Sequence, residues 1–139
     1  TIIGITSNDV FFQISADETN GNLESGSRLS RIAQHMLEQQ SYCPLFPPPI
    51  GINLDLRNID FCRMPCKPDL LIVPSKLTCF ARPICGSTMV VNPGHLAKGT
   101  TGGTYALMEI CPFERDLADS SLEGTFDLPD RITIDIKKI

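Results

Sequence analysis

A short apolar run bounded by prolines constrains this chain more than any other feature of its sequence. Residues 69–73 read Asp-Leu-Leu-Ile-Val, with Pro68 before them and Pro74 after them. A run of this length and character is typical of a strand that is buried on both faces. Residues 88–91 repeat the pattern. Because such strands need a layer on each side of their sheet, the chain is expected to have an α/β architecture.

The second half of the chain shows a different strand pattern. Residues 103–111 and 131–139 alternate apolar and polar side chains, which indicates two strands that each bury one face. We expect these strands to be neighbours, with the acidic, turn-rich residues 112–130 as a surface excursion between them. With an apolar strand at residues 1–5, the patterns predict a layered α/β domain whose mixed sheet is partly parallel and has antiparallel final strands.

One helix is clear and a second is open to two interpretations. Ser27 can cap a helix that ends near Gln40, because apolar residues between them recur at three- and four-residue spacing. After the first strand, residues 6–8 can cap a short helix with Asp9 in its first turn, and a second strand is the competing interpretation. The polar residues 17–26 indicate an exposed loop.

Length and charge limit the class of protein. The 139 residues suit one domain, and 12 basic against 16 acidic residues leave a net charge of −4. This balance argues against binding to DNA through charge alone. The longest apolar stretch falls far short of the roughly 20 residues that cross a bilayer, so we expect no membrane partner. Because an apolar strand opens the chain without a preceding Met, we expect further sequence upstream.

Six cysteines could form three disulfides, but the sequence favours free thiols. They are Cys43, Cys62, Cys66, Cys79, Cys85 and Cys111. No secretory segment opens the chain and most of these residues have apolar neighbours, so buried thiols in a reducing compartment are expected. Structural zinc sites pair ligands about two to four residues apart in both halves, and only the pair Cys62 and Cys66 fits. We therefore predict no zinc.

Residues 92–103 form the most suggestive loop, with the sequence Asn-Pro-Gly-His-Leu-Ala-Lys-Gly-Thr-Thr-Gly-Gly. As a phosphate-binding motif it fails, because Lys98 precedes Gly99 where the motif requires the lysine to follow the glycine. As a metal-binding Gly-His-x-His turn it also fails, since Ala97 occupies the second histidine position. We expect turn chemistry, in which the glycines lead from one strand to the next without steric cost. The predicted structural turn residues are Asn92, Pro93, Gly94, Gly99, Gly102 and Gly103.

No other residues form a recognisable catalytic set. His35 and His95 lack partners at metal-ligand spacing, and Ser75 lacks a nucleophile elbow. Paired carboxylates, such as Asp116 with Asp119, fall in polar stretches where a solvated loop is expected. We therefore predict no catalytic, metal-binding or cofactor-binding residues.

The proline-rich segment at residues 43–49, Cys-Pro-Leu-Phe-Pro-Pro-Pro, cannot be helical. Each proline fixes its own φ and restricts the residue before it. We interpret the segment as an extended rigid connector. A proline-rich ligand for a small adaptor domain is the alternative, since the polyproline II conformation suits both.

Four blocks of the sequence, in the same order, resemble the C-terminal part of the B subunits of DNA polymerase alpha. They are residues 4–12, 30–48, 68–77 and 91–106. The resemblance runs from residue 4 to about residue 110. The B subunits of polymerases delta and epsilon are the alternative, but the Asn-Pro-Gly-x-Leu-x-Lys-Gly and Gly-Gly-Thr blocks favour alpha.

The resemblance implies a calcineurin-like phosphoesterase fold. Residues 1–139 would be the C-terminal portion of that domain, with an oligonucleotide/oligosaccharide-binding domain upstream. Active relatives of the fold hold metals with Asp-x-His, Gly-Asp-x-x-Asp, Gly-Asn-His and Gly-His-x-His motifs, none of which occurs in this sequence. The last motif should follow the strand at residues 70–73, where the chain reads Pro-Ser-Lys-Leu. This loss fits an inactive phosphoesterase-like scaffold, and an active metal-dependent phosphoesterase is the alternative.

The resemblance further implies a role in assembly in the nucleus. Accessory subunits of this kind bind the C-terminal domain of the polymerase alpha catalytic subunit, share a complex with the primase subunits, support initiation of DNA replication and contact DNA only through the complex. The zinc-bearing cysteines of the assembly belong to the catalytic partner. Exposed apolar groups on a rigid segment make good anchors for a partner. The candidate partner contacts are therefore Leu45, Phe46, Pro47 and Pro48.

Overall fold

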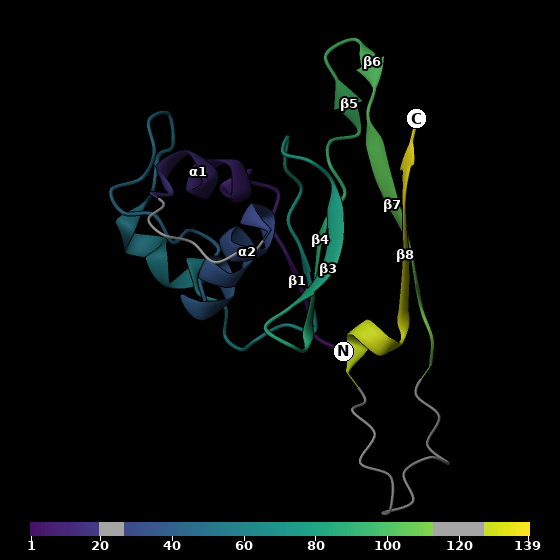
Figure 1. Cartoon of the computed structure of the whole chain (residues 1–139). Helices are drawn as coiled ribbons and strands as arrows, with labels where there is room; N and C mark the ends of the chain where they lie inside the picture. The colour runs from purple at the N-terminus through teal and green to yellow at the C-terminus, as the bar shows by residue number, and fades with distance from the viewer. Residues whose placement is uncertain (20–26, 113–126) are drawn as a thin grey trace, which may run out of the picture.

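The computed structural model describes residues 1–19, 27–112 and 127–139 and has a mixed α/β architecture (Figure 1). Two helices pack on one face of a four-stranded sheet and a two-stranded ribbon packs on the other. The helical elements are α1 (Val10–Asp17), α2 (Arg28–Glu38) and the 3-10 segments η1 (Leu56–Cys62) and η3 (Leu128–Asp130). The strands are β1 (Ile3–Ile5), β2 (Leu70–Ile72), β3 (Phe80–Ile84), β4 (Thr88–Asn92), β5 (Ala97–Lys98), β6 (Thr101–Gly102), β7 (Thr104–Ile110) and β8 (Ile132–Lys138).

The four-stranded sheet has the order β1-β2-β4-β3, with β1, β2 and β4 parallel and β3 antiparallel to β4. In this register Gly4 pairs with Leu71, and Leu71 pairs with Val90. Every residue of β4 is buried, as a central strand covered on both faces requires. The strands predicted at residues 1–5, 69–73 and 88–91 are confirmed as β1, β2 and β4, and the predicted mixed sheet is confirmed as well. The arrangement is consistent with the C-terminal portion of a phosphoesterase-like α/β domain.

The helices cover one face of the sheet because their apolar residues converge on it. Phe11 of α1 and the pair Ile32 and Met36 of α2 are fully buried. They join Leu71 and Val90 of the sheet in one core cluster. The amphipathic pattern that predicts α2 therefore identifies the helix face that contacts the sheet. The helical interpretation of the residues after β1 is confirmed by α1.

The caps of the two helices differ from expectation. Asp9 is the N-cap of α1 rather than a residue of its first turn, and its carboxylate accepts a hydrogen bond from the backbone N–H of Phe12 at 3.0 Å. Ser27 occupies the N-cap position of α2 but makes no side-chain capping bond. Most of the exposed loop predicted at residues 17–26 lies outside the described residues, which stop at 19 and resume at 27.

The ribbon of β7 and β8 covers the other face of the sheet. The two strands pair antiparallel along their whole length, so the prediction that they are neighbours is confirmed. Met108 and Ile134 pack toward Leu70 and the other residues of a second core cluster. Leu128 is buried in the same cluster, so the expectation that residues 112–130 are wholly a surface excursion is wrong at that position. Residues 113–126 of that segment lie outside the described part of the chain.

The burial of the cysteines differs from prediction. Cys66, Cys85 and Cys111 are exposed, and Cys43, Cys62 and Cys79 are half-buried, all as free thiols. The expectation of buried thiols is wrong. Successive side chains of an extended chain point in opposite directions, so an apolar neighbour in the sequence does not place a cysteine in the core. Phe80 enters the core, whereas the adjacent Cys79 lies against Thr104 with 3.4 Å between Sγ and Oγ1.

Neither of the α-helices that the structure describes is long and apolar enough to cross a bilayer.

Candidate functional site

Polar side chains that follow three parallel strands meet at one edge of the sheet. Asp9 follows β1, Lys76 follows β2 and His95 follows β4. The Asp9 carboxylate accepts a hydrogen bond from the backbone N–H of Lys76 at 3.0 Å and lies 3.9 Å from Nε2 of His95. The carboxyl ends of parallel strands are where ligand sites form in open α/β sheets. This edge is therefore the first candidate for a functional site.

Asn92, the last residue of β4, holds this edge together. Its side chain is fully buried, and its Oδ1 accepts hydrogen bonds from the backbone N–H groups of Ser75 and Gly94, both at 2.9 Å. Its Nδ2 donates to the carbonyl oxygens of Leu77 and Thr78, both at 3.2 Å. One side chain thus binds four backbone groups and fixes the segment after β2 against the turn after β4.

The predicted turn residues begin at the last residue of β4 and continue through the connection that leads from β4 to β7. They are Asn92, Pro93, Gly94, Gly99, Gly102 and Gly103. Gly94 and Gly99 have φ angles of 78° and 64°, a conformation that glycine adopts without steric cost. A side chain on Gly103 would collide with the carbonyl oxygen of His95. Gly94 and Gly99 are therefore favoured by their positive φ, whereas Gly103 is needed because the backbone at His95 and Leu96 approaches it closely.

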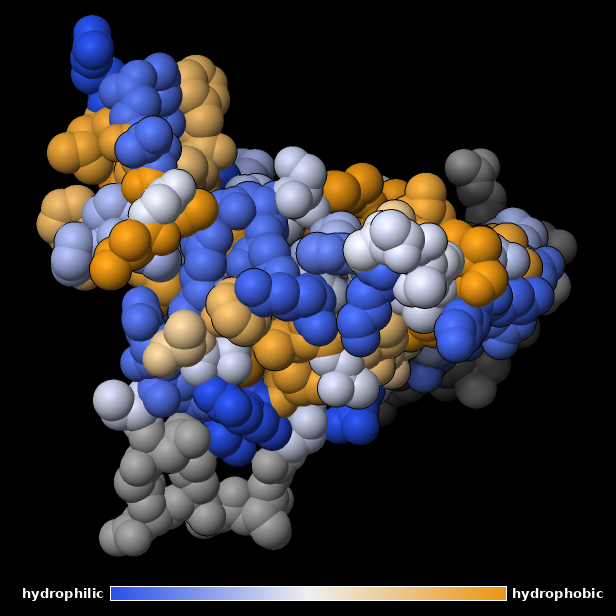
Figure 2. All heavy atoms as spheres, turned by 90° about the horizontal axis from the view of Figure 1, so that it is seen from above, coloured by the Kyte–Doolittle hydropathy of each residue, from blue (hydrophilic) through white to orange (hydrophobic). Residues whose placement is uncertain are grey.

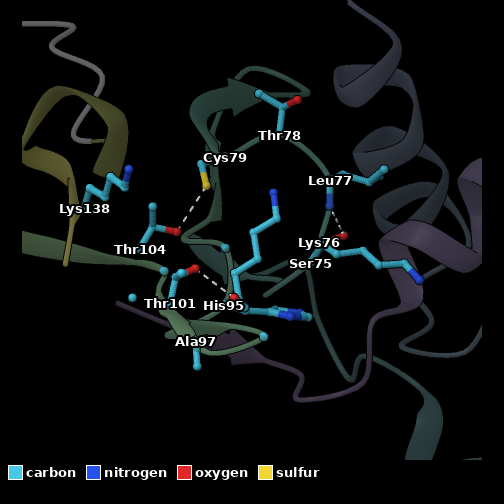
Figure 3. A pocket seen from close by; sticks show the side chains of 15 residues that line it. Ser75, Lys76, Leu77, Thr78, Cys79, His95, Ala97, Thr101, Thr104 and Lys138 are labelled. Carbon is cyan, nitrogen blue, oxygen red and sulfur yellow. Dashed lines mark hydrogen bonds between the residues drawn. The ribbon is translucent and has the colours of Figure 1, made fainter.

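A cavity of about 610 Å³ lies beside this connection (Figure 3). It is lined by the segment after β2, by the residues between β4 and β7, and by Lys138 near the end of β8. Lys76 belongs to the lining, but its ammonium group lies over the ring of Phe12 in α1, 3.4 Å from the centroid. Lys98 and the hydroxyl-bearing Thr78 also line the cavity. The charged side chains of its lining are therefore basic.

The residues at this edge offer few groups for metal-assisted hydrolysis. Asp9 and His95 converge, but within residues 1–19, 27–112 and 127–139 no three His, Cys, Asp or Glu side chains gather as a metal site requires. The Ser75 hydroxyl is buried and accepts a hydrogen bond from the backbone N–H of Leu77 at 3.1 Å.

A second candidate site is the excursion formed by residues 43–61. Its base is closed by two hydrogen bonds of 2.7 Å, from the backbone N–H of Tyr42 to the carbonyl of Cys62 and from that of Met64 to the carbonyl of Gln40. Between these bonds the chain forms η1, in which no residue is buried. Most side chains of η1 are exposed, which leaves its apolar groups available to another molecule.

Five large apolar side chains of this excursion are exposed to solvent. We call them the excursion surface: Phe46, Ile50, Leu56, Ile59 and Phe61. Phe46 is 74% exposed, Phe61 is 85% exposed, and Ile50 is fully exposed. Figure 2 shows hydrophobic side chains at the surface on the helical side of the molecule, at its left. Aromatic residues at this exposure are typical anchors of protein interfaces.

The four predicted partner-contact residues differ in their exposure. Leu45 packs against the core cluster that α1 and α2 form with the sheet. Phe46 and Pro47 are exposed, and Pro48 is half-buried. Four members of the excursion surface, at residues 50–61, were missed by sequence reasoning. The sequence did contain a signal for these residues. They are apolar, but they stand in a stretch with neither helical nor strand periodicity, so no pattern assigns them to a core.

The base of the excursion carries an unreactive thiol. Burial raises the pKa of the Cys43 thiol, and the nearby Cys62 raises this pKa further. Because only the thiolate is a good nucleophile, Cys43 stays protonated near neutral pH and is a poor reactive group.

The fold and its two sites define a mixed α/β domain with an exposed apolar surface and a cavity whose charged lining residues are basic. A family model for the B subunit of DNA polymerase alpha/epsilon matches residues 1–82. The chain therefore belongs to the DNA polymerase alpha/epsilon B-subunit family, a family of DNA replication.

Curated relatives from animals and fungi are named as the B subunit of DNA polymerase alpha. The mouse (Mus musculus) protein is 41% identical over 105 residues, which is 75% of this chain and 17% of the mouse protein. The rat (Rattus norvegicus) protein gives the same identity and shares. The fission yeast (Schizosaccharomyces pombe) protein is 29% identical over 119 residues, 81% of this chain and 21% of its own length. The resemblance to polymerase alpha B subunits is confirmed, and the chain spans about a fifth of these relatives.

Proposed function

We propose that this chain is a non-catalytic scaffold portion of an accessory B subunit, which binds the C-terminal domain of the DNA polymerase alpha catalytic subunit in the nucleus. Through that contact it supports the coupling of polymerase to the primase subunits and the initiation of DNA replication. The proposal extends to the domain itself, a single inactive calcineurin-like phosphoesterase portion over residues 1–139, with an oligonucleotide/oligosaccharide-binding domain upstream.

The excursion surface is the observation that supports this proposal most. Phe46 and Phe61 are large, aromatic and mostly exposed, and η1 has no buried residue. Fully desolvated aromatic residues commonly contribute most of the affinity at an interface. Two hydrogen bonds between backbone groups fix the two ends of the excursion next to each other, which lowers the ordering that binding requires there. The glycine turns of the β4–β7 connection are proposed to be structural.

Co-purification tests the proposal. A B subunit of full length that contains this chain is expressed with the C-terminal domain of a polymerase alpha catalytic subunit, and the metal content of the B chain is measured on the same sample. We expect an equimolar complex with a metal-poor B chain. Failure to form a complex, with two tightly bound metals per B chain, would instead identify a working phosphoesterase.

Paired substitutions locate the contact. Phe46→Ser with Phe61→Ser removes two exposed aromatic groups and is expected to weaken the complex at least tenfold, because interface anchors commonly contribute about 2 kcal/mol or more each. Tyr105→Ser and Leu107→Ser, on the exposed face of β7, form the matched control. Equal weakening by both pairs would place the contact elsewhere.

A further inference from the structure

We propose that the cavity beside the β4–β7 connection binds a phosphate group, such as that of a single-stranded nucleic acid backbone. The sequence alone predicts contact with DNA only through the complex, and it rejects the loop at residues 92–103 as a phosphate-binding motif because Lys98 stands on the wrong side of Gly99. In the fold, a second lysine from β8 reaches the same cavity. The proposal therefore rests on two lysines, Lys98 and Lys138, that are far apart in the sequence and line the same cavity in the fold.

The charges around the cavity favour an anion. Among the described residues, its lining contains Lys76, Lys98, Lys138 and His95, and no Asp or Glu. The carboxylate of Asp9, 3.9 Å from Nε2 of His95, lies outside the lining and is engaged by the backbone N–H groups of Phe12 in α1 and of Lys76. A chain with a net charge of −4 thus presents a cavity whose charged groups are basic. Such a cavity concentrates anions from solution.

Two of the lysines are available to a ligand. The ammonium groups of Lys98 and Lys138 have no hydrogen bond or ion pair with any residue that the structure describes. Lys76, by contrast, is placed over the Phe12 ring, in the direction of α1 (Figure 3). Lys98 lies in the exposed hairpin of β5 and β6, and Lys138 lies near the end of β8, so the two approach the cavity from separate elements.

The remaining lining favours phosphate over a stacked base. Four glycines line the cavity, and their lack of side chains allows a ligand to approach the backbone closely. The hydroxyl of Thr78 adds a polar group, and no Phe, Tyr or Trp on which a base could stack belongs to the described lining. Both strands of the β5–β6 hairpin are exposed, so the cavity opens to solvent and admits part of a longer polymer.

The test is binding of a fluorescein-labelled 20-nucleotide oligo(dT) to the purified chain, measured by fluorescence anisotropy from low to moderate salt. Lys98→Ala with Lys138→Ala is expected to weaken binding at least tenfold and to reduce the slope of log K against log[salt] by about 1.4, since each phosphate contact on a single strand contributes about 0.7. The control, Lys137→Ala, removes a neighbouring lysine of β8 that does not line the cavity and is expected to change neither value. Lys98→Arg with Lys138→Arg should retain binding, because both charges remain.

Further arms identify the source of the phosphate. An abasic oligonucleotide that binds as well as oligo(dT) supports recognition of the backbone. Binding of inorganic pyrophosphate alone, lost in the double alanine variant, supports phosphate recognition with a small ligand as its source. Three results overturn the proposal: no binding of either phosphate probe, equal binding by the double alanine variant, or binding of poly-glutamate in place of both probes. Thermal unfolding of each variant confirms that the fold is retained.

Discussion

Replacing Asn92 with alanine should destabilise the chain more than any exposed polar substitution. The buried amide of Asn92 accepts hydrogen bonds from the N–H groups of Ser75 and Gly94 and donates to two carbonyl groups. Ser75 and Gly94 are themselves buried, so Asn92→Ala leaves two donors without partners. Each such donor costs about 1–3 kcal/mol. Leu77 and Thr78 line the cavity and their hydrogen bonds to Asn92 are only partly buried, so water can replace these two bonds and their loss should add little.

The expected decrease in the free energy of unfolding is therefore about 2–6 kcal/mol, a large part of the roughly 5–15 kcal/mol that stabilises a typical domain. Urea denaturation followed by circular dichroism measures it, and the midpoint should fall without a change in slope. Asn58→Ala is the matched control, since Asn58 is exposed and donates only to Asp55. A decrease below about 1 kcal/mol, similar to that of the control, would refute the role assigned to Asn92.

Three further changes test other parts of the fold. Burial raises the pKa of Glu18, but hydrogen bonds and charge from Arg28 and Arg31 outweigh it and hold this pKa below its ordinary value. Glu18→Gln should therefore cost about 1–2 kcal/mol at pH 7, and denaturation curves of the two proteins should converge as the pH falls through the lowered pKa of Glu18, where the carboxylate becomes protonated in the folded protein. An unchanged difference at acid pH would show that the ion pairs are not its cause. Gly94→Ala combines a positive φ with a collision against Thr104 and should lower stability by about 2–4 kcal/mol in urea denaturation, whereas Gly86→Ala, with a positive φ and open space, should cost only about 1 kcal/mol. Leu71→Ala empties a fully buried position at the centre of the sheet and should cost about 2–5 kcal/mol by the same measurement; a smaller loss would mean that the core closes around the gap.

The sequence predicted the elements whose pattern matches their burial. Residues 70–72 and 88–92 are buried on both faces and read as apolar runs, and β7 and β8 bury one face and alternate. β3 escaped prediction because Arg82 and Pro83 interrupt its apolar pattern. Its position at the sheet edge tolerates them, since one side of an edge strand has no partner to hydrogen-bond.

The candidate sites were less predictable because they depend on contacts between distant residues. Nothing in the linear order relates Lys138 to Lys98, or Asp9 to His95, until the strands assemble. The excursion surface was hidden for another reason. Apolar residues are assumed to enter a core, and only the fold shows that Phe61 does not.

The affinity of the B subunit for the C-terminal domain of the polymerase alpha catalytic subunit tests the proposed role most directly. Isothermal titration calorimetry should give a one-to-one complex with a negative heat capacity change, as burial of an apolar surface requires. The variant with Phe46→Ser and Phe61→Ser should bind at least tenfold more weakly while it unfolds at the same urea concentration. Identical affinities for the variant and the unmodified protein would contradict a scaffold role for the excursion surface.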